Sequence, residues 1–519
     1  MIDARAFWPL VAARARATPD ALCAVDEFGA QLTFGELRAR AERVAAALAA
    51  RGVGSDVRVS WQLPTWIESL VLVAALARLG AVQNPLLPIY REREIGFIAR
   101  QVRPKLLVVP REFRGFDHAS LAQRVLAGIA REGGAPCELL VCDRALPEAD
   151  PAALPAFAPA RGEPVRWIFY TSGTTADPKG ALHSDETLAA GSRGVAERFE
   201  FGPADRYPIV FPFTHIGGIG MLVAQLLTGA GAILVEQYDD EKTPPLLGAH
   251  GVTLAAGGTP LVMRYLRYQR RHPGARVFPL LRAAIGGAAP KPPLLHREVK
   301  AELGGAGVLS VYGLTEAPFA TLSSPRDSDS ALAHSEGRAA GGAELRIVGG
   351  DGRVCAPDAE GEIRVRGPQI CRGYLDAKLD ADAFDADGFF RTGDLGWFDA
   401  DGYVVISGRL KDIIIRKGEN ISAKEVEDLL YDHPSVADVA VIGLPDPERG
   451  ERACAVVVPV PGAPDFTMDA MTAWCVDHGL MTQKVPEQLE LVDTLPRNPS
   501  GKVLKTRLRE DHGGAACPT

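Results

Sequence analysis

One short stretch, from Tyr170 to Gly180, reads Tyr-Thr-Ser-Gly-Thr-Thr-Ala-Asp-Pro-Lys-Gly and concentrates the chemistry of anion binding. Its hydroxyl groups can donate hydrogen bonds, its glycines permit close approaches that a Cβ would forbid, and Lys179 adds a compact positive charge. A polar turn is the ordinary explanation of such a cluster, but four hydroxyls with two glycines and a lysine exceed what a turn requires. The stretch therefore predicts a loop that holds a polyphosphate. It lacks the Gly-x-x-x-x-Gly-Lys-[Ser/Thr] spacing of the common nucleotide P-loop, which indicates a different class of nucleotide enzyme.

Three further segments combine turn residues with groups that can do chemistry. They read Tyr-Gly-Leu-Thr-Glu at 312–316, Phe-Arg-Thr-Gly-Asp at 390–394 and Leu-Pro-Arg-Asn-Pro-Ser-Gly-Lys at 495–502. The tyrosine can stack on a base, the glutamate can hold a magnesium ion that bridges phosphates, and the aspartate can accept hydrogen bonds from ribose hydroxyls. Taken singly, each segment is equally compatible with a strand end, a structural turn or a basic tail.

The elements that must position these segments change in character along the chain. Val165–Tyr170 predicts a strand that leads into the loop, and Thr33 to Glu36 has the form of a capping box before a helix of apolar positions spaced three to four residues apart. Alternating helical and strand-like stretches to about residue 325 predict parallel sheets covered by helices. Residues 344–398 predict short strands with tight turns, in a small antiparallel or barrel-like subdomain.

Beyond a charged, glycine-containing segment at 407–412, the pattern is that of a compact α+β domain. Helices are expected at 423–431 and 468–478, and strands at 436–442 and 453–460. The expected fold class is α/β: a large N-terminal domain over 1–408, with a barrel-like subdomain at about 340–408, then a hinge at 409–412 and a small mobile C-terminal domain over 413–519.

Composition narrows the class of protein. The 519 residues are 47% hydrophobic, enough for more than one domain core. A net charge of −8 argues against a nucleic-acid binder or a polybasic membrane anchor. The eight cysteines are scattered, with no Cys-x-x-Cys pair, and no apolar run approaches the roughly 20 residues of a membrane span. With no signal peptide visible, a soluble, cytoplasmic protein is expected.

Taken together, the segments occur in the order and at the approximate spacing of one family. From about Leu32 to Lys505 the chain resembles the adenylate-forming superfamily of acyl-CoA synthetases, the AMP-dependent ligases. The resemblance implies a two-step reaction: a carboxylate attacks the α-phosphate of ATP to give an acyl-adenylate and pyrophosphate, and the thiolate of coenzyme A then displaces AMP. ATP, Mg²⁺ and coenzyme A are the implied cofactors.

The resemblance also implies roles for individual residues of the nucleotide site. Glu316 would bind the magnesium ion, Thr315 the α-phosphate, and Asp394 the ribose, assisted by Arg409. Tyr312 would stack on adenine. The remaining ATP contacts implied are Thr171, Ser172, Gly173, Thr174, Thr175, Lys179, Gly287, Ala288 and Gly313.

A change of conformation between the half-reactions is implied as well. Lys502 resembles the lysine that contacts the attacking carboxylate and the α-phosphate during adenylation, where one well-placed donor is worth about 10²–10³ in rate. Lys411 stands at the position of the family's hinge, so that rotation there would withdraw Lys502. The same rotation would bring the coenzyme A-binding residues Lys417, Gly418, Glu419 and Asn420 to the thiol tunnel.

The segments that match the family's acyl pocket carry small side chains here and predict a wide apolar cavity. Its implied residues are Phe213, His215, Gly217, Gly218, Gly258, Gly286 and Gly287, with His215 near the substrate carboxylate and a structural histidine as the alternative. No acidic residue occurs at 213–215, which disfavours an amino-acid substrate. The expected substrate is a medium-sized aliphatic or alicyclic acid, such as a cyclohexanecarboxylate or a steroid-derived ring acid.

Several alternatives remain open at this point. The substrate can instead be a fatty acid, and the enzyme can instead be a ligase that loads a carrier protein. A luciferase and a non-catalytic binding protein fit the sequence less well. Acetylation would remove the charge of Lys502, so a lysine acetyltransferase and deacetylase are further expected partners, and a homodimer is left open.

Overall fold

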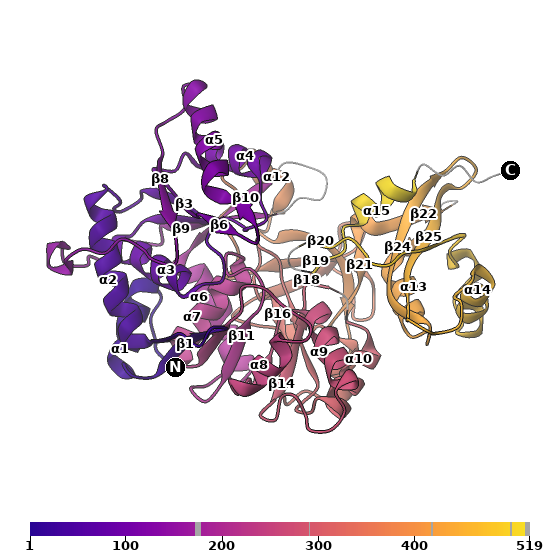
Figure 1. Cartoon of the computed structure of the whole chain (residues 1–519). Helices are drawn as coiled ribbons and strands as arrows, with labels where there is room; N and C mark the ends of the chain where they lie inside the picture. Colours follow the sequence, from indigo (N-terminus) through magenta and orange to yellow (C-terminus); the bar gives the residue numbers. More distant parts are fainter. Residues whose placement is uncertain (172–177, 290, 417–418, 499–500, 514–519) are drawn as a thin grey trace.

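The computed structural model describes residues 1–171, 178–289, 291–416, 419–498 and 501–513. A large N-terminal body is followed by a smaller C-terminal domain, which lies at the right of Figure 1. This arrangement, with several sheets covered by helices, confirms the predicted α/β fold class.

Two mainly parallel sheets build the first part of the body. The larger has the strand order β10-β9-β4-β3-β5-β8, parallel except at the β9/β10 hairpin. Its strands are β3 (Arg58–Trp61), β4 (Val82–Pro85), β5 (Leu106–Pro110), β8 (Glu138–Cys142), β9 (Val165–Thr171) and β10 (Lys179–Ser184). The smaller has the order β11-β12-β1-β2, with β1 (Leu22–Asp26), β2 (Gln31–Thr33), β11 (Arg206–Ile209) and β12 (Gly231–Leu234).

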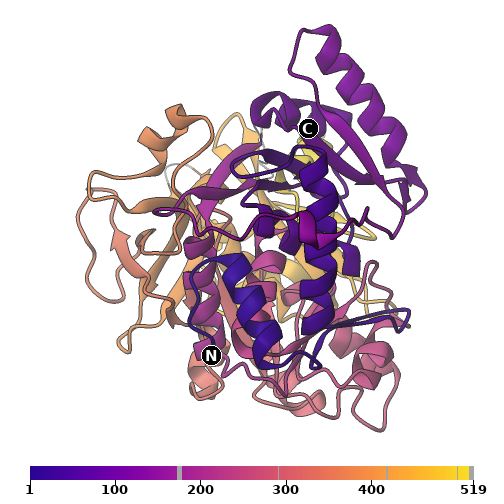
Figure 2. The same ribbon diagram turned by 90° about the vertical axis from the view of Figure 1, so that its left-hand side faces the viewer.

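Helices cover these two sheets, and Figure 2 shows the N-terminal ones in front. They are α1 (Phe7–Ala17), α2 (Phe34–Ala50), α3 (Ile67–Leu79), α4 (Glu92–Val102), α5 (His118–Arg131), α6 (Asp185–Arg198) and α7 (Ile216–Thr228). Helix α2 begins at the predicted capping box: the backbone N–H of Thr33 donates to Glu36 Oε2 (2.8 Å), and that of Glu36 to Thr33 Oγ1 (3.1 Å). Two orphan donors of the first turn are thereby satisfied.

A third sheet carries much of the site and has the order β13-β14-β15-β16-β17. Its strands are β13 (Leu254–Ala255), β14 (Ala283–Gly287), β15 (Val308–Tyr312), β16 (Thr321–Leu322) and β17 (Arg338–Ala339). The helices beside it are α8 (Thr243–Ala249), α9 (Thr259–Arg271), α10 (Pro293–Glu302) and α11 (Asp329–His334). Strands β13 to β15 are parallel, and the last pairs are antiparallel.

The predicted small subdomain is a four-stranded antiparallel sheet. Its strands, in order, are β18 (Glu344–Val348), β19 (Gly361–Arg366), β20 (Phe390–Phe398) and β21 (Val404–Arg409), with the short helix α12 (Asp380–Ala383) beside them. Among the described residues β18 and β21 are its two edges, so the sheet is open where a closed barrel was the alternative.

The chain leaves β21 through a single 3₁₀ turn at Leu410–Asp412 and enters the C-terminal domain. There β22 (Ile413–Arg416), β23 (Glu419–Ser422), β24 (Val436–Asp446), β25 (Gly450–Pro459) and β26 (Gln488–Leu491) form one sheet, packed with α13 (Ala423–Tyr431), α14 (Met468–Asp477) and α15 (Lys505–His512). Within the described parts of the chain, no helix has the length and apolar character that a bilayer crossing requires.

Candidate active site

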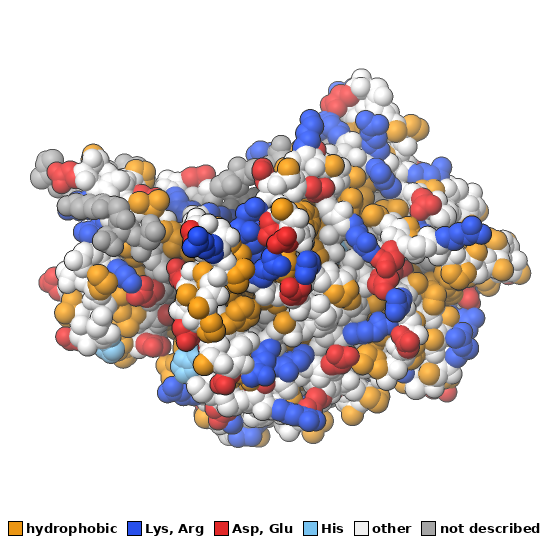
Figure 3. Space-filling model, turned by 180° about the vertical axis from the view of Figure 1, so that it is seen from behind, with side chains coloured by type: hydrophobic (Ala, Val, Ile, Leu, Met, Phe, Trp, Pro, Cys, Tyr) orange, Lys and Arg blue, Asp and Glu red, His pale blue; other side chains and the backbone are white. Residues whose placement is uncertain are grey.

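A cavity of about 670 Å³ lies between the two domains. Its volume is in the range of small-molecule sites. The body contributes the ends of β14 and β15 and the middle of β20, and the C-terminal domain contributes α13 and the segment before α15. Seen from behind in Figure 3, Lys and Arg side chains border the seam between the domains.

The nucleotide end of the cavity is built around Asp394, which is buried on β20. Arg409 lies opposite it on β21, and the Arg409 Nε atom is 2.6 Å from Asp394 Oδ1. The Tyr312 hydroxyl, from the end of β15, donates to Asp394 Oδ2 at 2.8 Å. Gly393, next to Asp394 within β20, has a φ of +69°, in the left-handed region that glycine adopts readily. The Asp394 carboxylate is thus oriented by two partners, Arg409 and Tyr312, in the wall of the cavity.

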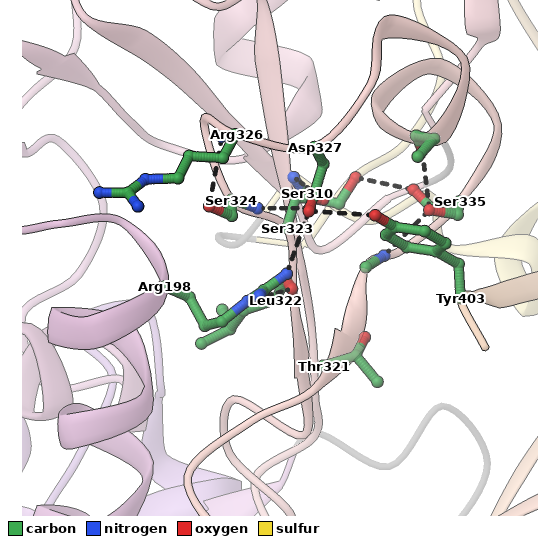
Figure 4. Close-up of polar contacts among 12 residues, drawn as sticks. Arg198, Ser310, Thr321, Leu322, Ser323, Ser324, Arg326, Asp327, Ser335 and Tyr403 are labelled. Atoms are coloured by element: carbon green, nitrogen blue, oxygen red, sulfur yellow. Dashed lines mark hydrogen bonds and ion pairs between the residues drawn. The ribbon is translucent and has the colours of Figure 1, made fainter. Parts of the chain in front are cut away.

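A polar network beneath this end joins the two sheets that supply those residues (Figure 4). Asp327 accepts a hydrogen bond from the Tyr403 hydroxyl (3.1 Å) beside β21 and pairs with Arg198 of α6 (3.2 Å). On β15, the Ser310 N–H donates to Ser323 Oγ (3.2 Å). These contacts join α6 and the residue before β21 to the loop after β16, and they join β15 to the same loop.

The predicted metal and α-phosphate residues follow β15. Glu316 is buried, and its Oε1 accepts a 2.7 Å hydrogen bond from the Tyr374 hydroxyl. The Thr315 carbonyl accepts a 2.9 Å hydrogen bond from His183 Nε2, so this ring nitrogen carries the proton. Burial lowers the pKa of His183 to about 4, which keeps it neutral. Tyr374 and His183 were not predicted, because their partners lie far away in sequence and no local pattern marks them.

Of the predicted phosphate loop, the structure describes only the two ends. Thr171 lines the cavity, and Lys179 is exposed on β10 with its Nζ atom 5.5 Å from the centre of the Tyr374 ring. Tyr374 therefore lies beside Lys179 with its ring and binds Glu316 with its hydroxyl. Ser172, Gly173, Thr174 and Thr175 lie outside the described residues.

Lys502 reaches the cavity from the C-terminal domain. Its turn is fixed by Asn498, whose Oδ1 accepts from the Lys502 N–H (2.9 Å), and by Gly501 at a φ of +85°. Burial, together with the positive charges of Arg409 and Lys411, lowers the pKa of Lys502 to about 8, and the carboxylates of Asp394 and Asp412 act in the opposite direction. Lys502 therefore lies close enough to Arg409, Lys411 and Asp394 for their charges to change its pKa.

The residues predicted to form the hinge and the coenzyme A-binding segment follow β21 in the chain. Lys411 lies in the 3₁₀ turn between β21 and β22, and burial with the neighbouring Arg409 charge lowers its pKa. Across the domain seam, Ser422 Oγ donates to the Ser407 carbonyl at 2.5 Å. Lys417 and Gly418 lie outside the described residues, while the backbones of Glu419 and Asn420 pair with β22.

The nucleotide and acyl ends meet at a backbone turn after β14. Gly286, Gly287, Ala288 and Gly313 all line the cavity. Gly287 and Ala288 have φ values of +150° and +60°, and the Gly287 N–H donates to Thr259 Oγ1 at 3.2 Å. A Cβ on Gly258 would lie 2.9 Å from the Gly287 carbonyl, so glycine is required for this close approach.

The acyl end has fewer of the expected residues than the sequence predicts. His215, Gly217 and Gly258 line the cavity, whereas Phe213 and Gly218 do not. Phe213 is fully buried with its ring 6.1 Å from that of Trp61, because its position before α7 turns it into the core. A Cβ on Gly218 would lie 2.5 Å from the Phe213 carbonyl oxygen, so this glycine permits chain packing. These two pocket assignments are corrected.

His215 has the structural role that the sequence left as an alternative, and it also lines the cavity. Its Nδ1 accepts a 3.1 Å hydrogen bond from the Gly217 N–H and so caps α7, which leaves the proton on Nε2. Burial lowers the pKa of His215 to about 4. A neutral imidazole that faces the cavity can donate a hydrogen bond to a carboxylate without adding charge.

The residues present suit ATP with magnesium. Among the described residues no cluster of three or more His, Cys, Asp or Glu side chains could hold a metal alone. Glu316 supplies one buried carboxylate, and Mg²⁺ commonly binds through one or two carboxylates together with phosphate oxygens. The metal would therefore arrive with the nucleotide.

Comparisons with known proteins agree with this geometry. The AMP-binding enzyme family model matches residues 11–375, and the AMP-binding enzyme C-terminal domain model matches residues 425–502. The medium-chain fatty-acid–CoA ligase of Escherichia coli (strain K12) is 32% identical over 96% of this chain and 88% of its own. A 3-[(3aS,4S,7aS)-7a-methyl-1,5-dioxo-octahydro-1H-inden-4-yl]propanoyl:CoA ligase of Rhodococcus jostii (strain RHA1) is 34% identical over 94% of this chain and 96% of its own.

Among solved structures, ATP-bound MatB from Rhodopseudomonas palustris superposes with a TM-score of 0.86 at 32% identity, covering 98% of this chain and 99% of its own. The chain therefore belongs to the AMP-binding enzyme family, as the resemblance of its motifs to adenylate-forming acyl-CoA synthetases predicts.

Proposed function

We propose that the protein is an ATP-dependent carboxylate–CoA ligase acting on a medium-sized aliphatic or alicyclic acid. Acyl-CoA ligase activity follows from the family and its named relatives, and it requires ATP, Mg²⁺ and coenzyme A. One observation supports the mechanism most: Lys502, Asp394 and Glu316 line the same cavity as His215, although they come from both domains.

In the first half-reaction, a carboxylate oxygen attacks the α-phosphorus and the bond to pyrophosphate breaks. We assign Asp394 to the ribose hydroxyls and Tyr312 to the adenine. The Lys502 ammonium and Thr315 would stabilise the negative charge that develops on the α-phosphate oxygens. Magnesium, when bound at Glu316, would neutralise the leaving pyrophosphate.

In the second half-reaction, the coenzyme A thiolate attacks the acyl carbon and the bond to AMP breaks. The thiol needs the space that Lys502 occupies, so the C-terminal domain must move first. We propose that residues 409–412 form the hinge, with Lys411 at its centre, and that the domain over 413–519 rotates about it. Glu419 and Asn420 on β23 would then face the thiol.

The acyl end of the cavity supports an apolar acid of moderate size. Its walls are apolar side chains with glycines at 217, 257 and 258, and Phe213, Thr214 and His215 provide no acidic group to pair with an α-ammonium. Charged or amino acid substrates would be desolvated there without a partner.

Pyrophosphate release across a panel of carboxylic acids, with and without coenzyme A, tests the proposal. Ring acids and medium-chain acids should give pyrophosphate and, with coenzyme A, a thioester. Activity on acetate or benzoates alone would overturn the substrate class. Adenylate formation with no thioester on adding coenzyme A would favour a ligase that loads a carrier protein.

A further inference from the structure

Besides His215, the acyl end of the cavity carries a tyrosine hydroxyl among apolar side chains. Phe199, Met221, Ile285 and Phe319 line it together with Tyr207, which comes from β11. The Tyr207 ring packs edge-on against Phe201, with centroids 6.1 Å apart. Its side chain is held by the core while one edge faces the cavity.

The Tyr207 hydroxyl has no hydrogen-bond partner among the described residues, although the side chain is only 5% exposed. The neighbouring Tyr265 differs, because its hydroxyl donates to the Ala256 carbonyl at 2.8 Å. Burial raises the pKa of Tyr207, so it remains a neutral O–H donor. Because the Tyr207 oxygen is accessible from the cavity, its O–H can donate to a ligand atom without breaking a hydrogen bond within the protein.

A second unpartnered polar side chain lies on α7, the helix that carries His215 at its N-terminus. Gly217 and Met221 line the cavity from successive turns of α7, and Gln225 is the next position in that row. Gln225 is fully buried, and neither its Oε1 nor its Nε2 atom has a partner within the described part of the chain. Gln225 does not itself line the cavity, so its amide lies behind the wall that Met221 forms.

We propose that Tyr207, with Gln225 behind Met221, forms a polar subsite at the distal end of the acyl pocket, which receives an oxo group of the substrate. The substrate would be a carboxylic acid with an apolar ring or chain and a carbonyl oxygen remote from the carboxylate. The Tyr207 O–H donates to that oxygen, while His215 lies at the carboxylate end. This inference rests on the proposed function and specifies its substrate class.

An unsubstituted hydrocarbon acid fits the apolar walls but leaves the Tyr207 hydroxyl without a partner. A site built to hydrogen-bond a substrate group discriminates against the analogue that lacks it, whereas an apolar pocket alone discriminates poorly between acids of similar size. The distal carbonyl oxygen of the substrate would therefore determine which acid is preferred, and the apolar walls would limit only the size of the acid.

The test compares matched pairs of acids that differ by one distal carbonyl, namely cyclohexanecarboxylate against 4-oxocyclohexanecarboxylate and 3-cyclohexylpropanoate against 3-(4-oxocyclohexyl)propanoate, with two-ring homologues of each. For at least one length, the wild-type kcat/KM for pyrophosphate release should favour the oxo acid by about tenfold. Tyr207→Phe should reduce that ratio to about twofold or less while retaining activity on the unsubstituted acid. Gln225→Leu should lower the same ratio and serves as the second variant.

Tyr238→Phe is the matched control. Tyr238 also has a buried hydroxyl without a partner, but it packs against Tyr265 outside the cavity wall. Its removal should leave the oxo preference unchanged. A wild-type enzyme without oxo preference at any length, or a preference that survives both Tyr207→Phe and Gln225→Leu, would overturn the subsite. In those cases the unsubstituted acids would still release pyrophosphate, whereas failure of the proposed function would abolish release with every acid.

Discussion

The Tyr312 hydroxyl donates a 2.8 Å hydrogen bond to Asp394 Oδ2 and so joins the end of β15 to β20, 82 residues later in the chain. The carboxylate also pairs with Arg409 and is only 2% exposed. The Asp394 carboxylate, which we propose binds the ribose, is therefore held in a fixed orientation by the protein itself. Removing the Tyr312 hydroxyl tests the orientation of the Asp394 carboxylate, whereas removing the carboxylate itself tests its charge.

Tyr312→Phe should lower kcat/KM for ATP by roughly 10-fold, because one hydrogen bond to a charged group is lost. Asp394→Ala should lower it by about 10²-fold or more, since both the ribose contact and the partner of Arg409 disappear. ATP–pyrophosphate exchange at varied ATP measures both, and circular dichroism controls for folding. Equal effects of the two variants would show that Tyr312 does more than orient Asp394.

The pH dependence of adenylation should report Lys502. Its lowered pKa, to about 8, means that the ammonium is charged below this pH and neutral above it. Only the charged form stabilises the α-phosphate, so kcat/KM for pyrophosphate release should fall as the pH rises through about 8, because this parameter reports the free enzyme. Lys502→Arg, which stays charged, should be slower but should lack this inflection. An identical inflection in Lys502→Arg would assign it to another group.

Stability against acid should depend on His183. Its pKa is about 4 when folded and 6.5 in the unfolded chain, so the unfolded state binds more protons in between. The stability is complete above pH 6.5 and is lost as the pH falls towards 4, at about 1.4 kcal/mol per pH unit for this residue. The urea midpoint of the wild type should fall between pH 7 and 5 more steeply than that of His183→Gln. Parallel slopes would contradict a neutral buried imidazole.

Lys411→Pro tests the hinge, because proline fixes φ near −65° at the turn between β21 and β22. Thioester formation should slow far more than pyrophosphate release, since only the second half-reaction needs the domain to rotate. Single-turnover assays separate the two steps, and Lys411→Ala controls for loss of the charge. If both half-reactions fall equally, the hinge assignment fails.

Local patterns in the sequence predicted the elements that depend on local physics. The capping box at Thr33 and Glu36 and the helix at 423–431 were predicted because propensity, capping and periodicity act within a few residues. The motif residues that line the cavity were predicted from the resemblance to a known family. Those assignments do not require knowledge of distant contacts.

The rest depends on contacts between distant segments. Tyr374 holds Glu316 from 58 residues away, and His183 holds the Thr315 carbonyl from 132 residues away. Phe213 was misplaced for the same reason, because only the packing against Trp61 shows that its ring turns inward. A pocket position cannot be told from a core position when both are apolar and adjacent in sequence.

The most direct test of the two-step account is Lys502→Ala, assayed separately in each half-reaction. The account predicts that pyrophosphate release falls by about 10²–10³-fold, because a charged donor to the α-phosphate is lost. Conversion of supplied acyl-adenylate and coenzyme A to thioester and AMP should stay within about threefold of the wild type, since Lys502 must leave the site for that step. Equal loss of both half-reactions, or adenylation at the wild-type rate, would contradict the account.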